Sequence, residues 1–427
     1  MKIIAHNCPH LEYLNIDWCS GIDTKGLRRV LQACPKLTDL RASELRGLDD
    51  QSFMLELFNR NTVERLFLSH CDSLNDDSLK VLFQGLDPEI DVLTERAIVP
   101  PRRLRHLDIS RCRTLTDDGV KSMAYHVPFL EGLRLGQNTT LTDDALMDIF
   151  ESGPALTHLD MDDLENITNA SLQSLAKSPA IDQLKHLSIS FCEQVGDVGM
   201  LPVLKAATNV TSLVLDNTRV SDLVLMEAAD MVRRRGSTEG RTSKPKQGLT
   251  LICFDCLNVT WAGVREVLNK NAYVMQARGA ARFAPNKAMP VVSIQESNGG
   301  SSSSSMNDVT TPFPVVAVPR LLYPAQYTSL KCFYGWQMTV DEHTKRVLRG
   351  NWSNASRLEM KWANWMIANE EMGAGTNLGG VVGRRRRRRA REAERTFLED
   401  EDGLDGDDGS GNNARRRRAR SGGCTVM

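Results

Sequence analysis

The chain has 427 residues, 41% of them hydrophobic, and its 53 basic and 54 acidic residues leave a formal net charge of −1. No stretch reaches the roughly 18 consecutive apolar residues of a membrane-spanning helix, and the first residues lack the apolar run of a secretory signal. We therefore expect a cytoplasmic or nuclear protein whose ten cysteines do not form a disulfide framework.

Leucine-type residues recur with a nearly constant spacing along the first part of the chain. The clearest copy runs from Leu104 to Val120 and reads LRHLDISRCRTLTDDGV. The first leucine-type residues of the copies are Leu11, Leu37, Val63, Leu104, Leu130, Leu156, Leu184 and Val210, with a ninth, weaker copy at Leu251. Five of the seven steps between the first eight are 26 residues long, which indicates stacked repeats that share one core.

Each copy combines a strand pattern with a helix pattern. The L-x-x-L-x-L phrase alternates apolar and polar residues, which predicts a short strand with one buried face. A helical pattern follows: in the copy at Leu104, Thr116 and Asp117 precede Val120 and Met123. Parallel strands joined by crossover helices are the structure that this alternation predicts. We expect a curved α/β solenoid over residues 1–279 with its parallel sheet on the concave side.

Paired aspartates stand at one phase of successive copies, as in Asp117-Asp118 and Asp143-Asp144. Carboxylate pairs can serve catalysis or metal binding, but recurrence at the same phase of successive copies is what helix capping predicts. The sequence has no phosphate-binding glycine loop, no HExxH and no nucleophile elbow. We therefore predict a non-catalytic protein with no cofactor and no metal site.

One repeat position, at the turn after the strand, is occupied by small residues. It holds Cys19, Cys71, Cys112, Cys192 and Cys256, with Asn138 and Thr218 as polar substitutes. A thiol at such a turn can donate a weak hydrogen bond to a backbone carbonyl. The lone Cys253-x-x-Cys256 has no second ligand pair, so we interpret these residues as buried structural thiols and not as zinc ligands.

These residues carry a family resemblance. Cys8-Pro9-His10-Leu11 through Cys19, Cys34-Pro35-Lys36-Leu37 and Leu115-Thr116-Asp117-Asp118-Gly119 resemble the cysteine-containing leucine-rich repeat of F-box/LRR proteins, over residues 1 to about 275. The resemblance implies a leucine-rich-repeat horseshoe that recognises a protein substrate for an SCF ubiquitin ligase, whose F-box binds the Skp1 adaptor of the cullin machinery. The sequence contains no F-box, so a Skp1–cullin partnership would need one upstream of residue 1.

Several segments interrupt or extend the repeats. Residues 86–101 and 232–248 are predicted insertion loops, and the serine- and glycine-rich residues 280–311 are a predicted flexible linker. Residues 312–372 contain four of the six tryptophans and predict either a cap over the last repeat or a separate partner-binding element. Residues 373–427 carry blocks of like charge and predict a disordered tail.

The tail holds two further motifs. Its last four residues, beginning at Cys424, fit a prenylation signal, and Arg415–Arg418 could supply the second signal for a peripheral membrane contact; the alternative is a chance match. The Arg384–Arg389 run could be a nuclear localisation signal or a nucleic-acid patch. No aromatic residues interleave with it, which disfavours specific nucleic-acid binding.

The remaining candidate is a partner-binding surface on the concave face. Strand residues that point away from the core form columns along the solenoid. Aromatic and arginine side chains dominate the binding energy of protein interfaces. The candidate residues are Trp18, Arg41, Phe67, His70, Asp108, Arg111, Arg134, Gln137 and Phe191. The alternative is that the aromatic residues only shield strand edges, and the column of His106, His158 and His186 is interpreted as structural.

The sequence supports two functional hypotheses. The first is a substrate-recognition subunit of an SCF-type ligase in ubiquitin-dependent protein degradation. The alternative is a leucine-rich-repeat scaffold or adaptor, tethered to a membrane or free, with no role in ubiquitin transfer. A leucine-rich-repeat GTPase-activating protein is disfavoured. The repeats of those proteins resemble units of about 28 or 29 residues with asparagine at the turn, whereas the repeats of this chain are mostly 26 residues long with cysteine there.

Overall fold

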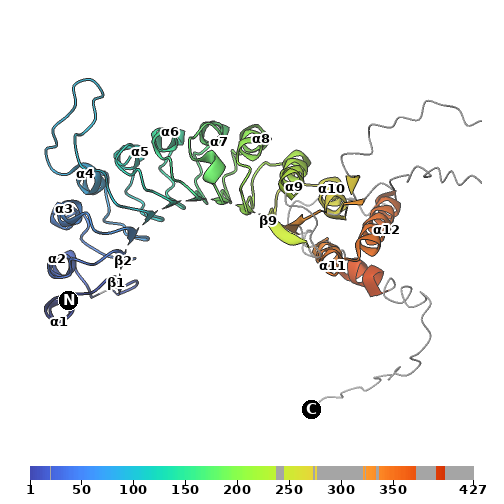
Figure 1. Ribbon diagram of the computed structural model, residues 1–427, viewed down its shortest axis with the longest axis horizontal. Coiled ribbons are helices and arrows are strands. Elements are labelled where there is room, and N and C mark those ends of the chain that lie inside the picture. Colours follow the sequence, from blue (N-terminus) through green and yellow to red (C-terminus); the bar gives the residue numbers. More distant parts are fainter. Residues whose placement is uncertain are drawn as a thin grey trace, which may run out of the picture.

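The computed structural model describes residues 1–19, 21–236, 245–272, 275–276, 321–322, 324–332, 336–371 and 391–399. The predicted linker at residues 280–311 and the prenylation candidate Cys424 lie outside these ranges. The chain forms a curved solenoid with helices along the outer side and a sheet along the inner side (Figure 1). The sheet has ten strands in the order β1 to β9 followed by β12, which confirms the leucine-rich-repeat solenoid predicted from the sequence.

The repeats supply nine of these strands and the outer helices. The strands are β1 (Tyr13–Asn15), β2 (Asp39–Arg41), β3 (Arg65–Phe67), β4 (His106–Asp108), β5 (Gly132–Arg134), β6 (His158–Asp160), β7 (His186–Ser188), β8 (Ser212–Val214) and β9 (Lys246–Ile252). The helices are α1 (Lys2–Asn7), α2 (Thr24–Ala33), α3 (Gln51–Arg60), α4 (Asp76–Gln84), α5 (Asp117–Lys121), α6 (Asp143–Ser152), α7 (Asn169–Leu175), η1 (Ile181–Gln183), α8 (Asp197–Ala206), α9 (Asp222–Gly236) and α10 (Trp261–Ala272).

In every repeat strand, one leucine pairs with the corresponding leucine of the next strand. The register runs through Leu14, Leu40, Leu66, Leu107, Leu133, Leu159, Leu187, Leu213 and Leu251, and all of them are buried. Neighbouring repeats therefore bury each other's leucines in one continuous core, and no repeat could bury its own apolar face alone.

From Cys71 onward, the thiols at the turn position hydrogen-bond to the preceding repeat, whereas Cys19 of the first repeat is exposed. The Sγ atom of Cys112 donates to the carbonyl of Leu68 at 3.2 Å, and that of Cys192 donates to the carbonyl of Met161 at 3.2 Å. Asn138 does more than a thiol can: its amide donates to two carbonyls and accepts from the Cys112 N–H at 2.7 Å. This position therefore links repeats through buried backbone groups.

The aspartate pairs need a correction. We predicted that they cap their own helices, but the first aspartate of each pair reaches the next repeat. The Asp143 carboxylate accepts from the Thr168 N–H at 2.8 Å and from the Thr168 hydroxyl at 2.6 Å. Asp117 binds Thr142 in the same way, at 2.8 and 2.5 Å. The aspartates recur in phase because they form a ladder from one repeat to the next.

The two insertions differ. Residues 86–101 project from the helical side next to α4 as a loop closed by a bridge between Ile90 and Ala97 (Figure 1). The prediction of a loop at 232–248 is wrong at both ends, because α9 continues to Gly236 and β9 begins at Lys246. The longer helix is held by the Arg235 guanidinium, which donates to the backbone carbonyls of Thr208 and Val210.

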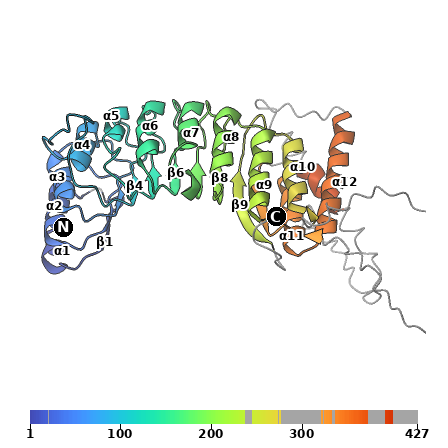
Figure 2. The same cartoon turned by 45° about the horizontal axis from the view of Figure 1, so that its top comes forward.

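The tryptophan-rich segment continues the solenoid beyond the repeats. It supplies β12 (Gln326–Lys331), which pairs in parallel with β9, and the helices α11 (Gln337–Leu348) and α12 (Trp352–Glu371). The buried Asn271 of α10 donates to the carbonyl of Thr328 and accepts from its N–H, both at 2.8 Å. Figure 2 shows α10, α11 and α12 together at this end. The short β10 (Met275–Gln276) pairs with β11 (Leu321–Leu322).

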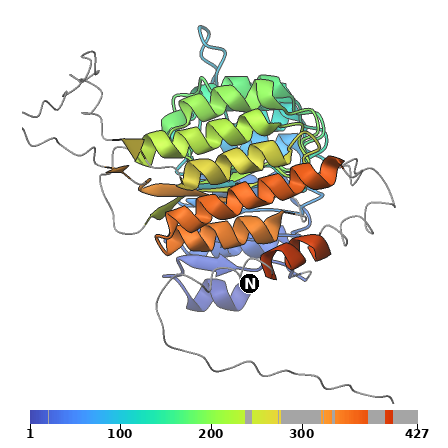
Figure 3. The same ribbon diagram turned by 90° about the vertical axis from the view of Figure 1, so that its right-hand side faces the viewer.

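The tail prediction also needs a correction. We predicted disorder throughout residues 373–427, but residues 391–399 form a helix. Figure 3 shows this helix in red beside α11 and α12. Its buried Glu394 contacts α11 and its Phe397 contacts α12, and both contacts help to hold it against the fold. Together, β12, α11, α12 and residues 391–399 are called the C-terminal region.

Among the described residues, no helix combines the length and the apolar character needed to cross a bilayer.

Candidate functional site

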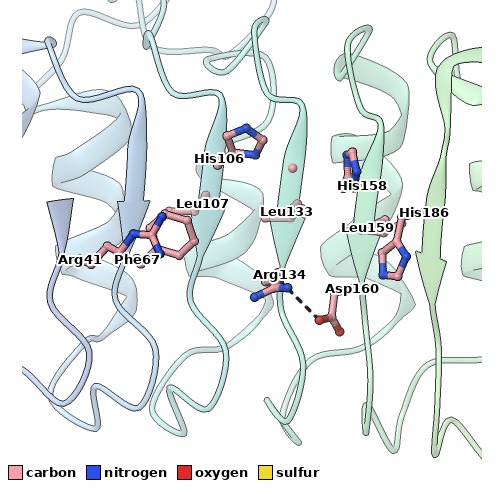
Figure 4. Close-up of a pocket in the computed structure, with 11 residues that line it drawn as sticks. Arg41, Phe67, His106, Leu107, Leu133, Arg134, His158, Leu159, Asp160 and His186 are labelled. Carbon is pink, nitrogen blue, oxygen red and sulfur yellow. Dashed lines mark ion pairs between the residues drawn. The ribbon is translucent and has the colours of Figure 1, made fainter. Parts of the chain in front are cut away.

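A groove of about 320 Å³ runs across the concave face of the middle strands (Figure 4). The first and third residues of each three-residue strand point into it, because alternate residues of a strand share a face. Its lining residues are Arg41, Phe67, His106, Leu107, Gly132, Leu133, Arg134, His158, Leu159, Asp160 and His186. Of the candidate residues, the structure brings Arg41, Phe67 and Arg134 together in this groove.

Arg41 and Phe67 form one wall. The Arg41 guanidinium carbon lies 4.5 Å from the centre of the Phe67 ring and 5.6 Å from that of Tyr13, within the range of cation–π attraction. Its Nε atom lies 3.4 Å from a carboxylate oxygen of Asp39. The planar guanidinium is thus held in place while its outer edge remains available to a ligand.

Arg134 lies between two aspartates in the middle of the groove. Its guanidinium is 3.7 Å from the carboxylate of Asp108 on one neighbouring strand and 3.7 Å from that of Asp160 on the other. Burial, and then the neighbouring Asp162, raise the pKa of Asp160. The groove therefore offers both signs of charge on adjacent strands, which suits a polar peptide better than a purely anionic ligand.

The histidine column belongs to this surface, which the sequence interpretation missed. His106, His158 and His186 are the first residues of their strands and share a face with the third residues. Gly132 makes room for the His106 ring, because a Cβ there would lie 2.4 Å from its Nδ1 atom. Burial lowers the pKa of His106 and of His186. The sequence did contain a signal for this: His106 and Asp108 are two residues apart in one strand, so their side chains lie on the same face.

Five other candidate residues lie outside the groove. Trp18, His70, Arg111, Gln137 and Phe191 were predicted as strand residues of the concave face, but each lies three residues beyond its strand with φ between 58° and 64°. This left-handed turn lets their N–H groups continue the backbone ladder to the next repeat; that of Phe191, for example, donates to the Asp216 carbonyl at 2.7 Å. They form a separate rim beside the groove, where Trp18 and Phe191 are 58% and 52% exposed.

The Trp18 and His70 rings lie 5.1 Å apart, so the rim includes at least one aromatic pair. The buried thiols behind the groove are poor nucleophiles, because burial raises the pKa of Cys71 and of Cys192 to about 12. Within the described ranges, no three His, Cys, Asp or Glu side chains are placed to hold a metal ion. The geometry offers a binding surface of aromatic and charged side chains.

Comparison with known proteins agrees with this architecture. The Leucine Rich repeat family matches residues 7–30, 102–124 and 184–204. The DNA repair protein rhp7 of Schizosaccharomyces pombe is 28% identical over 203 residues, and F-box/LRR-repeat protein 4 of Bos taurus is 26% identical over 142 residues. These alignments cover 46% and 33% of this chain, but only 33% and 20% of the relatives' own lengths.

Among solved structures, a yeast Rad7–Elc1 complex matches with a TM-score of 0.41 and 17% identity, over 61% of this chain and 73% of the other. The repeats themselves, their register and the sequence relatives support one conclusion. The chain contains leucine-rich repeats, and parts of it are similar in sequence to an F-box/LRR-repeat protein and to rhp7.

Proposed function

We propose that the chain is a protein-binding subunit that presents substrates to an SCF-type ubiquitin ligase, with the concave groove as its substrate site. The observation that carries the proposal is the groove itself, in which Arg41, Phe67 and Arg134 converge on one inward-facing surface. These are residue types that dominate protein interfaces, and the curved sheet offers them to an extended partner. Solenoids of this kind act as binding scaffolds, and the ligase itself would supply catalysis.

One relative favours the ligase hypothesis, and another favours a nuclear location. The name of F-box/LRR-repeat protein 4 refers to an F-box, the element that joins repeats of this kind to Skp1 and cullin. The name of rhp7 refers to DNA repair, which favours a nuclear site of action. The alternative function is an adaptor outside ubiquitin transfer. A membrane-tethered form of that adaptor would need a prenylated Cys424.

The test compares two triple variants of the full chain, purified from cells after crosslinking and measured by quantitative mass spectrometry. Arg41→Ala, Phe67→Ala and Arg134→Ala together remove the groove side chains. Met147→Ala, Val198→Ala and Leu223→Ala remove exposed apolar side chains of the outer helices and form the matched control.

We expect the groove variant to lose at least tenfold of the proteins that both the wild type and the control capture, with unchanged thermal unfolding. When the chain is expressed with the upstream F-box that the ligase hypothesis requires, the captured proteins should include Skp1 and a cullin, and the ubiquitination of the other captured proteins should fall in the groove variant. Equal capture by both triple variants would refute the groove. Groove-dependent capture without Skp1 or cullin by the chain that carries the F-box would favour the adaptor. The mass of the terminal peptide reports prenylation of Cys424 in the same experiment.

A further inference from the structure

The N-terminus of α11 is capped by a residue from a distant part of the chain. Trp336, the residue at its N-cap position, makes no side-chain hydrogen bond to the first turn. Instead, one carboxylate oxygen of Glu394 accepts from the Thr339 N–H and from the Thr339 hydroxyl, both at 2.7 Å. Free N–H groups at a helix N-terminus favour a carboxylate. The cap therefore comes from the helix at residues 391–399.

A second contact of that helix is aromatic. Trp362 and Trp365 of α12 stack with their ring centres 4.6 Å apart. Phe397 meets Trp362 edge-on at 5.0 Å and Trp365 at 6.4 Å, which is the favoured geometry for aromatic rings. Glu394 and Phe397 are three residues apart, so they lie on one face of their helix. The surface of α11 and α12 thus recognises an acid and an aromatic ring at helical spacing.

The helix at 391–399 buries one of its faces. Glu394 is fully buried, Phe397 is half-buried, and the side chains of Arg391, Glu392, Arg395, Thr396 and Glu399 are exposed. A short isolated helix is only marginally stable in water, so the contacts with α11 and α12 contribute to its order.

The buried acid also weakens the attachment. The second carboxylate oxygen of Glu394 has no hydrogen-bond partner among the described residues. Burying a carboxylate that is only half satisfied costs free energy, which subtracts from what the aromatic contact contributes. These opposing contributions favour a helix that can leave the surface of α11 and α12 while the rest of the fold stays intact.

We propose that the surface of α11 and α12 binds a short amphipathic helix with a glutamate and a phenylalanine three residues apart. Residues 391–399 cover this surface in the free protein, and a helix of the same pattern from a partner protein replaces them. This site lies at the opposite end of the solenoid from β1 and uses none of the concave residues, so it does not depend on the proposed ligase function (Figure 1).

The test uses a fluorescent peptide with the sequence of residues 390–400 and two full-length chains. One chain is the wild type. The other carries Glu394→Ala and Phe397→Ala, so that its own helix no longer covers the surface of α11 and α12. Fluorescence anisotropy should show that the peptide binds the double variant at least tenfold more tightly than the wild type. A second peptide, alanine-based with the glutamate and the phenylalanine retained, should also bind the double variant, because those two side chains make the helix cap and the ring contacts.

Matched peptides provide the controls. The peptide with Phe397→Ala should bind at least tenfold more weakly, whereas the peptide with Arg395→Ala, a change at an exposed position, should bind unchanged. No peptide binding to the double variant, or equal binding of the Phe397→Ala and Arg395→Ala peptides, would overturn the proposal.

Two measurements on the wild type distinguish a releasable helix from a permanently packed helix and from one exchanged between two copies. Hydrogen exchange should be at least tenfold faster at residues 391–399 than in α12; exchange in step with α11 and α12 would make the helix a fixed part of the fold and refute the proposal. Dimerisation that rises with concentration and is abolished by Phe397→Ala would mean that the surface of α11 and α12 binds the helix of a second copy. That result would overturn the assignment to another protein.

Discussion

In the middle of the solenoid, each repeat meets the next through the same set of contacts. A leucine pairs with a leucine, a small polar residue at the turn binds a carbonyl of the preceding repeat, and an aspartate binds the next threonine. In the C-terminal region, each contact occurs once. Asn271 joins α10 to β12, the Arg265 guanidinium pairs with the largely buried carboxylate of Glu359, and Glu394 caps α11.

The difference teaches where each region is vulnerable. In an array, a weakened contact between two repeats leaves the same contact intact elsewhere, so stability is distributed. The C-terminal region ends the array by contacts that have no copies, and one residue there can hold several elements. We propose that this region covers the last repeat, and Trp362 is its central residue.

The largest effect is expected for Trp362→Ala. The side chain is 1% exposed and contacts the rings of Trp261, Trp365 and Phe397, so it joins α10, α12 and the helix at 391–399. The substitution should reduce the free energy of unfolding by about 3–5 kcal/mol, measured by chemical denaturation. An exposed residue of the same helix, Met360→Ala, is the control and should cost little. Equal losses would contradict the central role of Trp362.

In the repeats, Asn138→Ala should come next. The substitution leaves two carbonyls and the Cys112 N–H without their buried partner, so we expect a loss of about 2–4 kcal/mol by the same measurement. Asn138→Cys keeps one donor at the position where other repeats carry cysteine, and it should lose about half as much. If both variants lost nothing, the turn position would not stabilise the stack.

The aspartate ladder predicts opposite outcomes for neighbouring residues. Asp143→Ala should cost about 1.5–3 kcal/mol, because the carboxylate accepts from the N–H and the hydroxyl of Thr168. Asp144→Ala should change the free energy of unfolding by less than about 0.5 kcal/mol, because the Asp144 side chain is 71% exposed. Equal effects would restore the interpretation in which both aspartates serve their own helix.

The smallest effect concerns pH in the C-terminal region. Burial, opposed by the Thr339 hydrogen bonds and assisted by the Asp341 charge, raises the pKa of Glu394 to about 7. The bound helix therefore holds a proton more tightly than the free helix, so binding is strongest below the usual pKa of the acid and weakens as pH rises toward 7. Peptide binding should be roughly tenfold weaker at pH 8 than at pH 6.

Two features make this pH change attributable to Glu394. The pKa of the buried His343 in α11 is lowered to about 3, so that residue stays neutral over this range. A peptide with Glu394→Gln should bind with no pH dependence between pH 6 and pH 8. If its affinity fell in the same way, another group would be responsible.

The sequence determined the repeated part of this protein. Leucines such as Leu107 and Leu133 recur every 26 residues, and a period of that kind has only one way to bury its apolar face, by stacking. The thiol-to-carbonyl contact of Cys112 followed from the same periodicity. Arg41, Phe67 and Arg134 were placed on the groove because alternate strand residues share a face.

Only the tertiary structure decided contacts that occur once or cross between repeats. Asp143 fits a helix cap equally well in sequence, and its partner Thr168 becomes visible only when the repeats are stacked. In the sequence, Trp18 fits the alternating pattern of the strand before it. In the structure, a left-handed turn moves it to the rim. Glu394 lies 55 residues from Thr339, and no local pattern announces a contact that depends on how two distant segments pack. Periodicity encodes what neighbours share, whereas a single long-range contact leaves no repeated trace in the sequence.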